Sequence, residues 1–528
     1  NEEDTQSVYL EYPTINFLKN KEIKKVFDRI PDYMWDNIEE TLPTRIILEK
    51  ELPTKKSWAK LIHGKITQAV SSEDIAQAHF RTIYEKVFHQ IHQNIKEKKE
   101  HQYHKSKNLS ISLESLKSIL KLFPFDLTTD QSNVVNEIIK DLDSSKPMIR
   151  LLQGDVGTGK TCIAIIASVI AIQNNSQVAL MCPTESLAQQ HFIEFKSILK
   201  SSCSIELLLG SQSQSHKNQI KKDLQNGSLD IIVGTHALIQ ESISFFNLGL
   251  AIIDEQQKFG VNQKNQLLEK AKGVHSLYIS ATPIPRDLKL AQYGKIDLSI
   301  IKTQPKNKKD IKTKIITESN FNLFLKFLKT RLSMGEQAYI VVPRIHSNNK
   351  DARNNFYLKN IFQKFKSLFP EYNVESFHGE LSLTKKEDVF RKFHSGEISL
   401  LCATSIIEVG INVPNATTIA IFKPDCFGLS SLHQLRGRVG RGGKPGFCFI
   451  IKTKEITNDH SLKRIKTFEK YNDGFKIADE DLRLRGEGDI IGTKQSGLSP
   501  FKSLETFVKI DENFLYNIEQ DVLKCIKY

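Results

Sequence analysis

Apolar residues in the first part of the chain recur at helical spacing. Over residues 71–97 they return every three or four positions, and Ser71 and Asp74 have the spacing of a capping box. This pattern predicts a long amphipathic helix whose simplest role is packing, and residues 1–122 as a whole read as mainly helical. The apolar positions of the long helix are Ile75, Phe80, Ile83, Tyr84, Val87, Phe88 and Ile91.

Short apolar runs separated by helical patterns begin at residue 123. Strands separated by helices predict a parallel sheet with helices on both faces. Ligands bind such sheets beyond the carboxyl ends of the strands, so the residues that follow each run are candidates for a site. The strands predicted in this first lobe, residues 123–304, are Met148–Leu152, Gln177–Cys182, Ile205–Leu209, Asp230–Val233, Leu250–Asp254 and Ser276–Ser280.

A second alternating unit, residues 305–457, follows a lysine-rich stretch. Lys302–Lys314 contains six lysines and one proline and is predicted to be a linker. Residues 458–528 return to a helical pattern. The predicted fold class is therefore α/β, with two parallel-sheet lobes between helical terminal regions. The strands predicted in the second lobe are Ala338–Val342, Val374–His378, Leu400–Thr404, Thr418–Phe422 and Phe447–Ile451.

The first predicted strand of lobe 1 runs into a glycine-rich loop and then into a helix. Eight residues fit the phosphate-binding pattern G-x-x-x-x-G-K-[ST]. The glycines let several backbone N–H groups converge, and the helix adds its positive end. Lys160 would reach the outer phosphates of a nucleotide and Thr161 would hold Mg²⁺; the alternative is a chance glycine loop. The predicted contacts are Gly154, Asp155, Val156, Gly157, Thr158, Gly159, Lys160 and Thr161.

Two carboxylates end another apolar strand, L-A-I-I-D-E at residues 250–255. A buried strand has no structural use for two acids at its tip. Beside a phosphate loop, Asp254 would bind the Mg²⁺ that bridges the phosphates, and Glu255 would orient or deprotonate the attacking water. The alternative is an acidic N-cap for the next helix.

The second lobe contains Q-L-R-G-R-V-G-R at residues 434–441. Arginines interleaved with glycines present fixed bidentate donors on a tight backbone. If the two lobes sandwich a nucleotide, Arg438 and Arg441 would act as arginine fingers, which contribute about 10³–10⁵ in rate, and Gln434 would join the nucleotide site. A basic surface loop does not explain the spaced glycines.

Weaker signals lie near other strand ends. Ser280 and Thr282 suit a relay that senses the carboxylates; the alternative is a plain turn, which Pro283 and Pro285 also favour. Gln131 has the donor and acceptor needed to read an adenine edge, and it and Phe125, in the segment that precedes the first strand, are predicted nucleotide contacts. The residues predicted to hold a nucleic-acid backbone, each more simply explained singly as turn chemistry, are Thr184, Thr235, His236 and Thr404.

The overall charge agrees with a polyanionic partner. Lys and Arg number 74 against 61 Asp and Glu, a net charge of +13. This balance suits nucleic acid, although the bias toward Lys, Ile and Asn accounts for it as well. Seven cysteines without a C-x-x-C pair indicate reduced thiols in a cytosolic protein. Without an apolar run of about 18 residues, no membrane-spanning helix is expected.

Taken in order, these segments resemble the motifs of superfamily 2 helicases, most closely those of the bacterial RecG family. The resemblance covers nearly the whole chain. The matching segments are L-L-Q-G-D-V-G-T-G-K-T, C-P-T-E-S-L-A-Q-Q-H, I-I-V-G-T-H-A-L-I-Q, D-E-Q-Q-K-F-G-V, S-A-T-P-I-P-R-D-L, T-S-I-I-E-V-G-I-N-V-P-N-A and H-Q-L-R-G-R-V-G-R-G.

This resemblance implies two RecA-like lobes, ATP and Mg²⁺ as cofactors, and a motor that drives stalled forks backwards into four-way junctions in DNA repair and recombination. Asp479–Gly497 resembles the family's translocation motif, a helical hairpin plus loop, with Arg485 and Gln495 as key polar residues. The expected partner is branched double-stranded DNA, with single-stranded DNA-binding protein as a further candidate. A monomer in the bacterial cytoplasm, associated with the nucleoid, is expected.

The chain departs from the family pattern at two places. Gln257 stands where the family usually has His; it can still hydrogen-bond between lobes, so coupling is expected to survive. Tyr9–Thr14 resembles the segment just after the family's wedge domain, an oligonucleotide-binding fold that splits the fork. That domain is absent from these residues, as expected of either a fragment or a naturally shortened protein, and branch specificity is expected to be weak.

Two rival functions stay open. The motor half of a transcription-repair coupling factor shares the translocation motif, but would carry a polymerase-binding domain upstream. A decayed, non-catalytic DNA-binding protein would explain Gln257 and the missing wedge. Against it, all five predicted catalytic residues are present: Lys160, Asp254, Glu255, Arg438 and Arg441.

Overall fold

A computed structural model describes residues 20–63, 71–101, 105–200, 202–280, 296–304, 311–343, 358–404, 413–440, 443–452, 459–485 and 512–526. The chain divides into two compact units. Unit 1 comprises Asn1–Glu100, Ile284–Ile296 and Arg485–Tyr528, and unit 2 comprises His101–Pro283 and Asp297–Leu484. Both predicted lobes belong to unit 2.

Lobe 1 of unit 2 is built on a seven-stranded sheet in the order β3-β4-β2-β5-β6-β1-β7, in which every pair is parallel. The carboxyl ends of β1, β6 and β5 therefore lie side by side at one edge. The strands are β1 (Ile149–Gly154), β2 (Gln177–Met181), β3 (Ile205–Leu208), β4 (Ile231–Gly234), β5 (Leu248–Ile253), β6 (His275–Ser280) and β7 (Asp297–Ile301).

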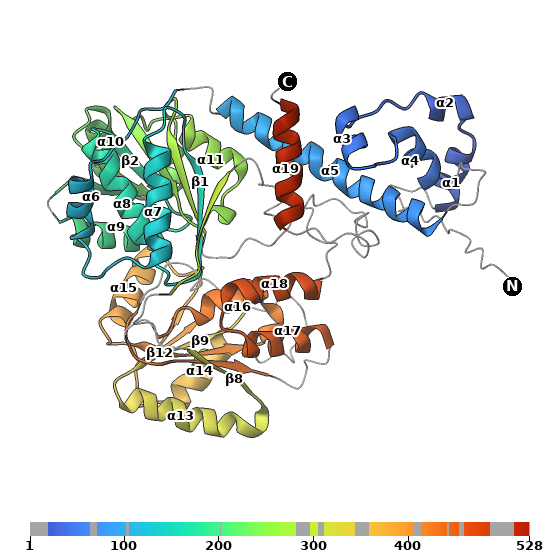
Figure 1. Ribbon diagram of the computed structural model, residues 1–528. Helices are drawn as coiled ribbons and strands as arrows, with labels where there is room; N and C mark the ends of the chain where they lie inside the picture. Colours follow the sequence, from blue (N-terminus) through green and yellow to red (C-terminus); the bar gives the residue numbers. More distant parts are fainter. Residues whose placement is uncertain are drawn as a thin grey trace. The chain divides into compact units, whose positions relative to one another are not determined.

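Helices cover this sheet (Figure 1). The helix that follows the glycine loop, α8, is apolar on nearly all sides because it is buried against the sheet and its neighbours. The helices of this lobe are α6 (Leu113–Leu120), α7 (Thr129–Leu142), α8 (Lys160–Gln173), α9 (Glu185–Leu199), α10 (Gln214–Gln225) and α11 (Val261–Leu268), with short 3₁₀ turns η1 (His236–Ile239) and η2 (Gln256–Lys258).

Lobe 2 has a six-stranded parallel sheet in the order β10-β11-β9-β12-β13-β8. Its strands are β8 (Ile311–Ile316), β9 (Gln337–Val341), β10 (Val374–Phe377), β11 (Leu400–Ala403), β12 (Ala416–Phe422) and β13 (Gly446–Ile451). Its helices are α13 (Phe321–Ser333), α14 (Leu358–Leu368), α15 (Leu383–His394), α16 (Leu429–Arg436), α17 (Asp459–Lys470) and α18 (Gly474–Arg485), with 3₁₀ turns η3 (Glu318–Asn320) and η5 (Pro424–Cys426).

Alternate residues of the lobe 2 strands enter two different hydrophobic clusters. Ile419 and Ile421 belong to the cluster that includes α15, α16 and α17, whereas Ala420 and Phe422 belong to the cluster with α13 and α14. Figure 1 shows α13 and α14 on the opposite side of the sheet from α16 and α17. A strand buried on both faces reads as a continuous apolar run, which explains why these strands were recognisable in the sequence.

The predicted class of two parallel-sheet α/β lobes is confirmed, and most predicted strands match within two residues. The linker prediction for 302–314 is wrong at its end, because β8 begins at Ile311. In β8 the half-buried Ile311, Thr313 and Ile315 alternate with exposed lysines. Charged side chains are common on the edge strand of a sheet, and β8 is such an edge. Strand β7 was also missed.

Unit 1 is helical, and its described core joins both ends of the chain. Side chains of α5 (Ser72–His101) pack with Leu515, Ile518 and Val522 of α19 (Glu512–Ile526). At the start of α5, Ser71 and Asp74 exchange hydrogen bonds, as the capping box predicted. The other described helices of unit 1 are α1 (Asn20–Asp28), α2 (Asp32–Asp36), α3 (Thr44–Glu49) and α4 (Lys55–Ile62).

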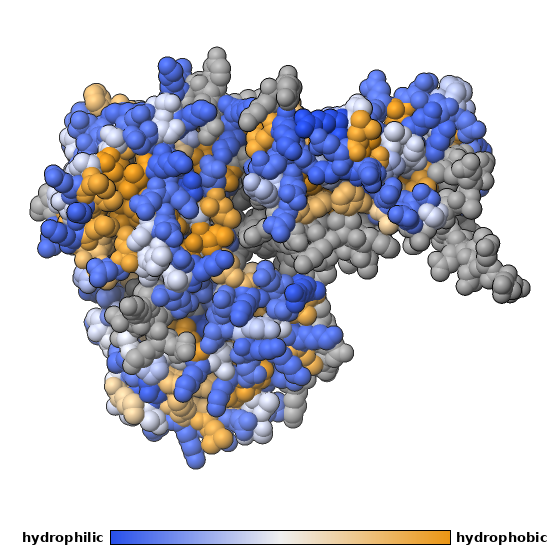
Figure 2. Space-filling model, in the orientation of Figure 1, coloured by the Kyte–Doolittle hydropathy of each residue, from blue (hydrophilic) through white to orange (hydrophobic). Residues whose placement is uncertain are grey.

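The surface is mixed in character. On the face shown in Figure 2, hydrophilic side chains predominate, and apolar ones gather in smaller patches. Within the described part of the chain, no helix has both the length and the apolar content needed to cross a bilayer.

Candidate nucleotide site between the two lobes

The glycine loop connects β1 to α8 at the carboxyl edge of the lobe 1 sheet. Gly159 caps α8 with φ +81°, a left-handed conformation that favours glycine. The Lys160 amine folds back over the loop and donates to the carbonyl oxygens of Gly154, at 2.8 Å, and Asp155, at 2.9 Å. Thr161 lies half-buried in the first turn of α8. The loop therefore brings the Lys160 amine over its own backbone at the N-terminus of α8, where the sequence predicts phosphate binding.

Gln131 holds the loop from the side of α7. It forms a capping box with Thr128 at the start of α7, and its Nε2 donates to the carbonyl oxygen of Thr158 at 2.8 Å. A Cβ atom on Gly159 would lie 2.4 Å from that Nε2, so the loop needs glycine here for space as well. The predicted nucleotide residue Gln131 is thus against the loop, and Phe125 is half exposed with its ring 5.8 Å from that of Phe123.

The two carboxylates follow the end of β5, and β6 lies between β5 and the strand that leads into the loop, β1. Asp254 is buried, and its Oδ1 accepts the Glu255 amide at 2.8 Å. Its Oδ2 lies 2.7 Å from Nε2 of His191 on α9. Glu255 has φ +48°, an uncommon conformation for a residue with a side chain.

The surroundings shift the pKa values of these two acids in opposite directions. Burial alone would raise the pKa of Asp254, but the His191 hydrogen bond and the charge of Lys160 outweigh it, so the pKa is lowered. Burial, reinforced by the charge of Asp254, raises the pKa of Glu255. Two neighbouring acids with different pKa values can take different roles. The acid with the lowered pKa stays ionised and can bind a cation, and the acid with the raised pKa can accept a proton.

Glu255 is connected to the neighbouring strand end by hydrogen bonds. Gln257 donates from Nε2 to the Glu255 carboxylate, and Ser280 Oγ donates to Gln257 Oε1 at 3.3 Å. Ser280 ends β6, the strand between β5 and β1. Gln257 therefore bridges the predicted catalytic residue Glu255 and the predicted coupling residue Ser280 within lobe 1.

Lobe 2 contacts the loop through the C-terminal end of α16. His433 Nε2 lies 2.5 Å from Asp155 Oδ1, and both side chains are buried. Arg436 donates from Nη2 to His433 Nδ1 at 2.8 Å. Because Nδ1 accepts this bond, the neutral imidazole carries its proton on Nε2 and donates it to Asp155. A carboxylate and a guanidinium in different lobes are thus joined through one imidazole.

Arg436 extends this connection to the C-terminal helices. It is almost fully buried and donates to carbonyl oxygens of Phe468 at 3.1 Å, Tyr471 at 2.8 Å and Asn472 at 3.0 Å, around the end of α17. A cavity of about 290 Å³ lies beside this network. It is lined by Asp155, Val156, Lys302, Gln304, Ile311, His433, Arg436, Gly437, Asn472, Asp473 and Phe475.

The remaining predicted residues of lobe 2 fall partly within the described chain. Gln434 and Arg438 are buried on and just after α16, next to Gly437, which lies against Val156 of the loop. The predictions for Thr282, Arg441 and Gln495 concern residues outside the described part. Arg485 is the last residue of α18, and its side chain is also outside that part.

The predicted nucleic-acid contacts lie at strand ends in both lobes. Thr184 caps α9 by accepting the Leu187 amide, and His236 is exposed after β4. Thr235 is buried, and its hydroxyl has no hydrogen-bond partner among the described residues. Thr404 is buried at the end of β11. The first three lie at the carboxyl ends of two adjacent strands, β2 and β4.

His191, His433 and Arg436 were not predicted as site residues. His191 and Asp254 are 63 positions apart, and His433 and Asp155 are 278 apart. Both histidines lie inside sequence segments that resembled helicase motifs, which was the available signal. Their partners follow only from the three-dimensional arrangement.

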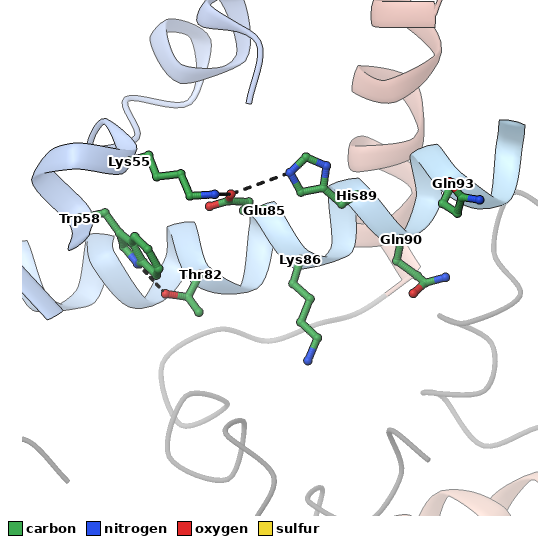
Figure 3. Close-up of a pocket in the computed structure, with 8 residues that line it drawn as sticks. All are labelled: Lys55, Trp58, Thr82, Glu85, Lys86, His89, Gln90 and Gln93. Carbon is green, nitrogen blue, oxygen red and sulfur yellow. Dashed lines mark hydrogen bonds and ion pairs between the residues drawn. The ribbon is translucent and has the colours of Figure 1, made fainter. Parts of the chain in front are cut away.

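Unit 1 has a separate groove along α5 (Figure 3). Within it Lys55 pairs with Glu85 at 2.7 Å, and Trp58 Nε1 donates to Thr82 Oγ1 at 2.8 Å. Its described lining includes no predicted site residue. The lining residues are Lys55, Trp58, Thr82, Glu85, Lys86, His89, Gln90 and Gln93.

Three family models match the chain. Residues 128–291 match DEAD/DEAH box helicases, and residues 319–443 match the helicase conserved C-terminal domain. Residues 471–508 match the C-terminal part of domain 3 of ATP-dependent DNA helicase RecG.

Curated relatives named ATP-dependent DNA helicase RecG are similar over most of the chain. The protein of Aquifex aeolicus is 39% identical over 96% of this chain, and that of Thermotoga maritima 38% over 94%. The Bacillus subtilis protein is 38% identical over 88% of this chain and 68% of its own length. The chain spans 65% and 63% of the lengths of the Aquifex and Thermotoga proteins.

Among solved structures, one of RecG bound to a three-way DNA junction is similar with a TM-score of 0.74 at 34% identity. The match covers 96% of this chain and 64% of that one. The helicase MrfA bound to DNA, 15% identical with a TM-score of 0.52 over 70% of this chain, shares the fold.

Proposed function

We propose, from the premise that this chain belongs to the RecG family of DNA helicases, that it hydrolyses ATP to move along branched double-stranded DNA. One observation carries the proposal more than any other. The phosphate loop of lobe 1 and the arginine-rich segment of lobe 2 lie against each other, through His433 and Asp155 and through Gly437 and Val156.

The described residues fit a nucleotide with Mg²⁺. The loop backbone and the N-terminus of α8 would bind the phosphates, and Lys160 would leave the loop carbonyls to pair with the outer ones. Thr161 and Asp254 would hold the cation, which would neutralise charge on the phosphates. The electrostatic effect of Lys160 on Asp254 supports their proximity.

Glu255 would accept a proton from the attacking water or orient it, because its raised pKa suits a proton acceptor better than Asp254. Arg438 and Arg441 would stabilise charge that develops on the transferred phosphoryl group. Gln434 would contact the nucleotide from lobe 2. Through their hydrogen bonds, Gln257 and Ser280 would transmit a change in the position of Glu255 to the rest of the lobe.

The DNA would run over the strand ends that carry Thr184, Thr235, His236 and Thr404, with Arg485 and Gln495 in the moving element. The similarity to a RecG bound to a three-way junction supports forks and four-way junctions as substrates. The +13 net charge supports a polyanionic ligand. We also propose a monomeric motor in the bacterial cytoplasm, near the nucleoid, with single-stranded DNA-binding protein as a partner.

The test compares ATP hydrolysis by the whole chain with and without a synthetic fork. DNA should stimulate hydrolysis, and Lys160→Ala should abolish it while the variant still binds the fork. Equal hydrolysis by wild type and variant in all conditions would refute the proposal. Binding to the fork without any hydrolysis would instead favour a non-catalytic DNA-binding protein.

A further inference from the structure

A buried histidine lies behind the Asp254 carboxylate. His191 is on α9 and is 5% exposed, and Asp254 is 7% exposed. The 2.7 Å contact between Nε2 and Oδ2 is a hydrogen bond donated by the imidazole, because an ionised carboxylate can only accept. A helix of lobe 1 therefore holds the residue at the end of β5.

The Asp254 carboxylate is held at both oxygens. Oδ1 accepts the Glu255 amide at 2.8 Å while Oδ2 accepts from His191, so the carboxylate cannot turn without losing a bond. Each carboxylate oxygen has two lone-pair sites, which leaves capacity for a cation. The backbone amide of Asp254 is fixed as well, since it donates to the Met181 carbonyl of β2 at 3.0 Å.

We propose that His191 is a positioning residue that sets the orientation of Asp254 toward Mg²⁺. This inference rests on the proposed function, which makes Asp254 a cation ligand. Residues that hydrogen-bond to a metal ligand fix its direction, and removing one typically costs about 10–100-fold in metal affinity or activity. Without His191, Asp254 keeps its charge but loses one of two constraints.

A purely structural role would predict a different result. His191 also packs in the core of the lobe, with its ring 6.5 Å from that of Phe195. His275 provides a matched comparison, because it is a buried histidine of the same sheet at the amino end of β6. It accepts from the Met148 amide at 3.1 Å and lies 2.7 Å from Ser106 Oγ, at the opposite edge from Asp254. A stability effect alone would be shared by both sites.

The experiment measures binding of a fluorescent, non-hydrolysable ATP analogue to the full chain, first with a chelator and then over a MgCl₂ titration. In His191→Leu the Mg²⁺ concentration at half effect should rise by about 10–100-fold, with chelator-state affinity unchanged. His191→Gln keeps an amide donor of similar reach and should restore most of the response. His275→Gln should leave the titration at its wild-type position.

Equal Mg²⁺ titrations for His191→Leu and His275→Gln would overturn the inference, as would a folded His191→Gln no better than His191→Leu. Should His191→Leu not fold, His191→Asn replaces it, because its shorter amide ends before Asp254. Absence of any Mg²⁺ effect in the wild type would overturn the proposed function itself.

Discussion

Hydrogen bonds through a single imidazole connect the Asp155 carboxylate to lobe 2. The carboxylate, the neutral His433 ring and the Arg436 guanidinium form a continuous buried series of hydrogen bonds. Each end would be costly to bury alone, since an unpaired buried charge is strongly unfavourable. The imidazole is suited to this place because it offers one donor and one acceptor on opposite sides.

Replacing His433 by Leu should therefore loosen the contact between the lobes. Two hydrogen bonds to charged groups are lost, each contributing about 1.5–3 kcal/mol. Thermal unfolding followed by circular dichroism should show a lower midpoint, and DNA-stimulated ATP hydrolysis should fall. His433→Gln keeps a donor and an acceptor and should lose less on both measures; equal losses for Leu and Gln would contradict this account.

His275 should make the stability of lobe 1 dependent on pH. Burial lowers its pKa below the ordinary value near 6.5, so the unfolded chain binds a proton more readily than the folded one. Stability from this group is complete at high pH and falls as pH drops below the unfolded pKa, by at most about 1.4 kcal/mol per pH unit. In thermal scans, the difference between wild type and His275→Gln should shrink as pH is lowered; a constant difference would contradict it.

At the residue scale, the site residues that could be predicted are those that belong to motifs of fixed spacing along the chain. Lys160, Asp254 and Glu255 follow apolar runs at strand ends, and such ends converge in a parallel sheet. The hydrogen-bond partners of His191 and His433 are far away in sequence. These contacts could not be predicted without knowing which elements pack together in the fold.

Among the elements, α18 begins close to the phosphate loop. A Cβ atom on its first residue, Gly474, would lie 2.7 Å from His433 Nε2 and 3.1 Å from Asp155 Oδ1. Any side chain there would force α18 away or break the contact between the lobes. The absence of a side chain at this point lets a C-terminal helix approach the predicted nucleotide site.

Gly474→Ala should accordingly weaken the coupling between DNA and ATP hydrolysis. We expect the DNA-stimulated rate to fall more than the basal rate, because Lys160 and Asp254 are untouched. Gly379→Ala is the control, since nothing lies within 4 Å of a Cβ there. Parallel loss of basal and stimulated rates would show that Gly474 matters only for stability.

Element prediction succeeded where burial was uniform, and it also found the edge strands β3 and β10, but it failed at β7 and β8, the opposite edge of each sheet. The central strands of lobe 2 are buried on both faces and read as continuous apolar runs. Edge strand β8 carries Lys312 and Lys314 on its exposed side, and this composition resembles that of a linker. Pairing with β13 decides its structure, and local sequence does not report pairing.

At the scale of the whole molecule, each unit has its own core. In unit 1, segments 437 positions apart are joined when Tyr84 donates to Asp521 at 2.8 Å. Leu515, Ile518 and Val522 of α19 complete the apolar face of α5. The order of the two lobes could be predicted from motif order, but this return of the chain end to α5 could not.

Ile518→Ala should destabilise unit 1 by about 2–5 kcal/mol, as large-to-small core changes do. Both tryptophans of the chain, Trp35 and Trp58, lie in unit 1. Their fluorescence should therefore report an earlier unfolding transition, while nucleotide binding stays unchanged. Tyr516→Ala, on the exposed side of α19, should leave the fluorescence transition in place; an equal shift in both variants would contradict the assigned core.

The bonds from Arg436 to the end of α17 have a consequence for protein engineering. A chimera joined in the connection between β13 and α17 would combine this guanidinium with a foreign helix end. The foreign segment would then have to supply three carbonyl oxygens in the positions that accept hydrogen bonds from Arg436. Grafts of the C-terminal helices should carry α16 with them, since the natural boundary of exchange lies before that helix.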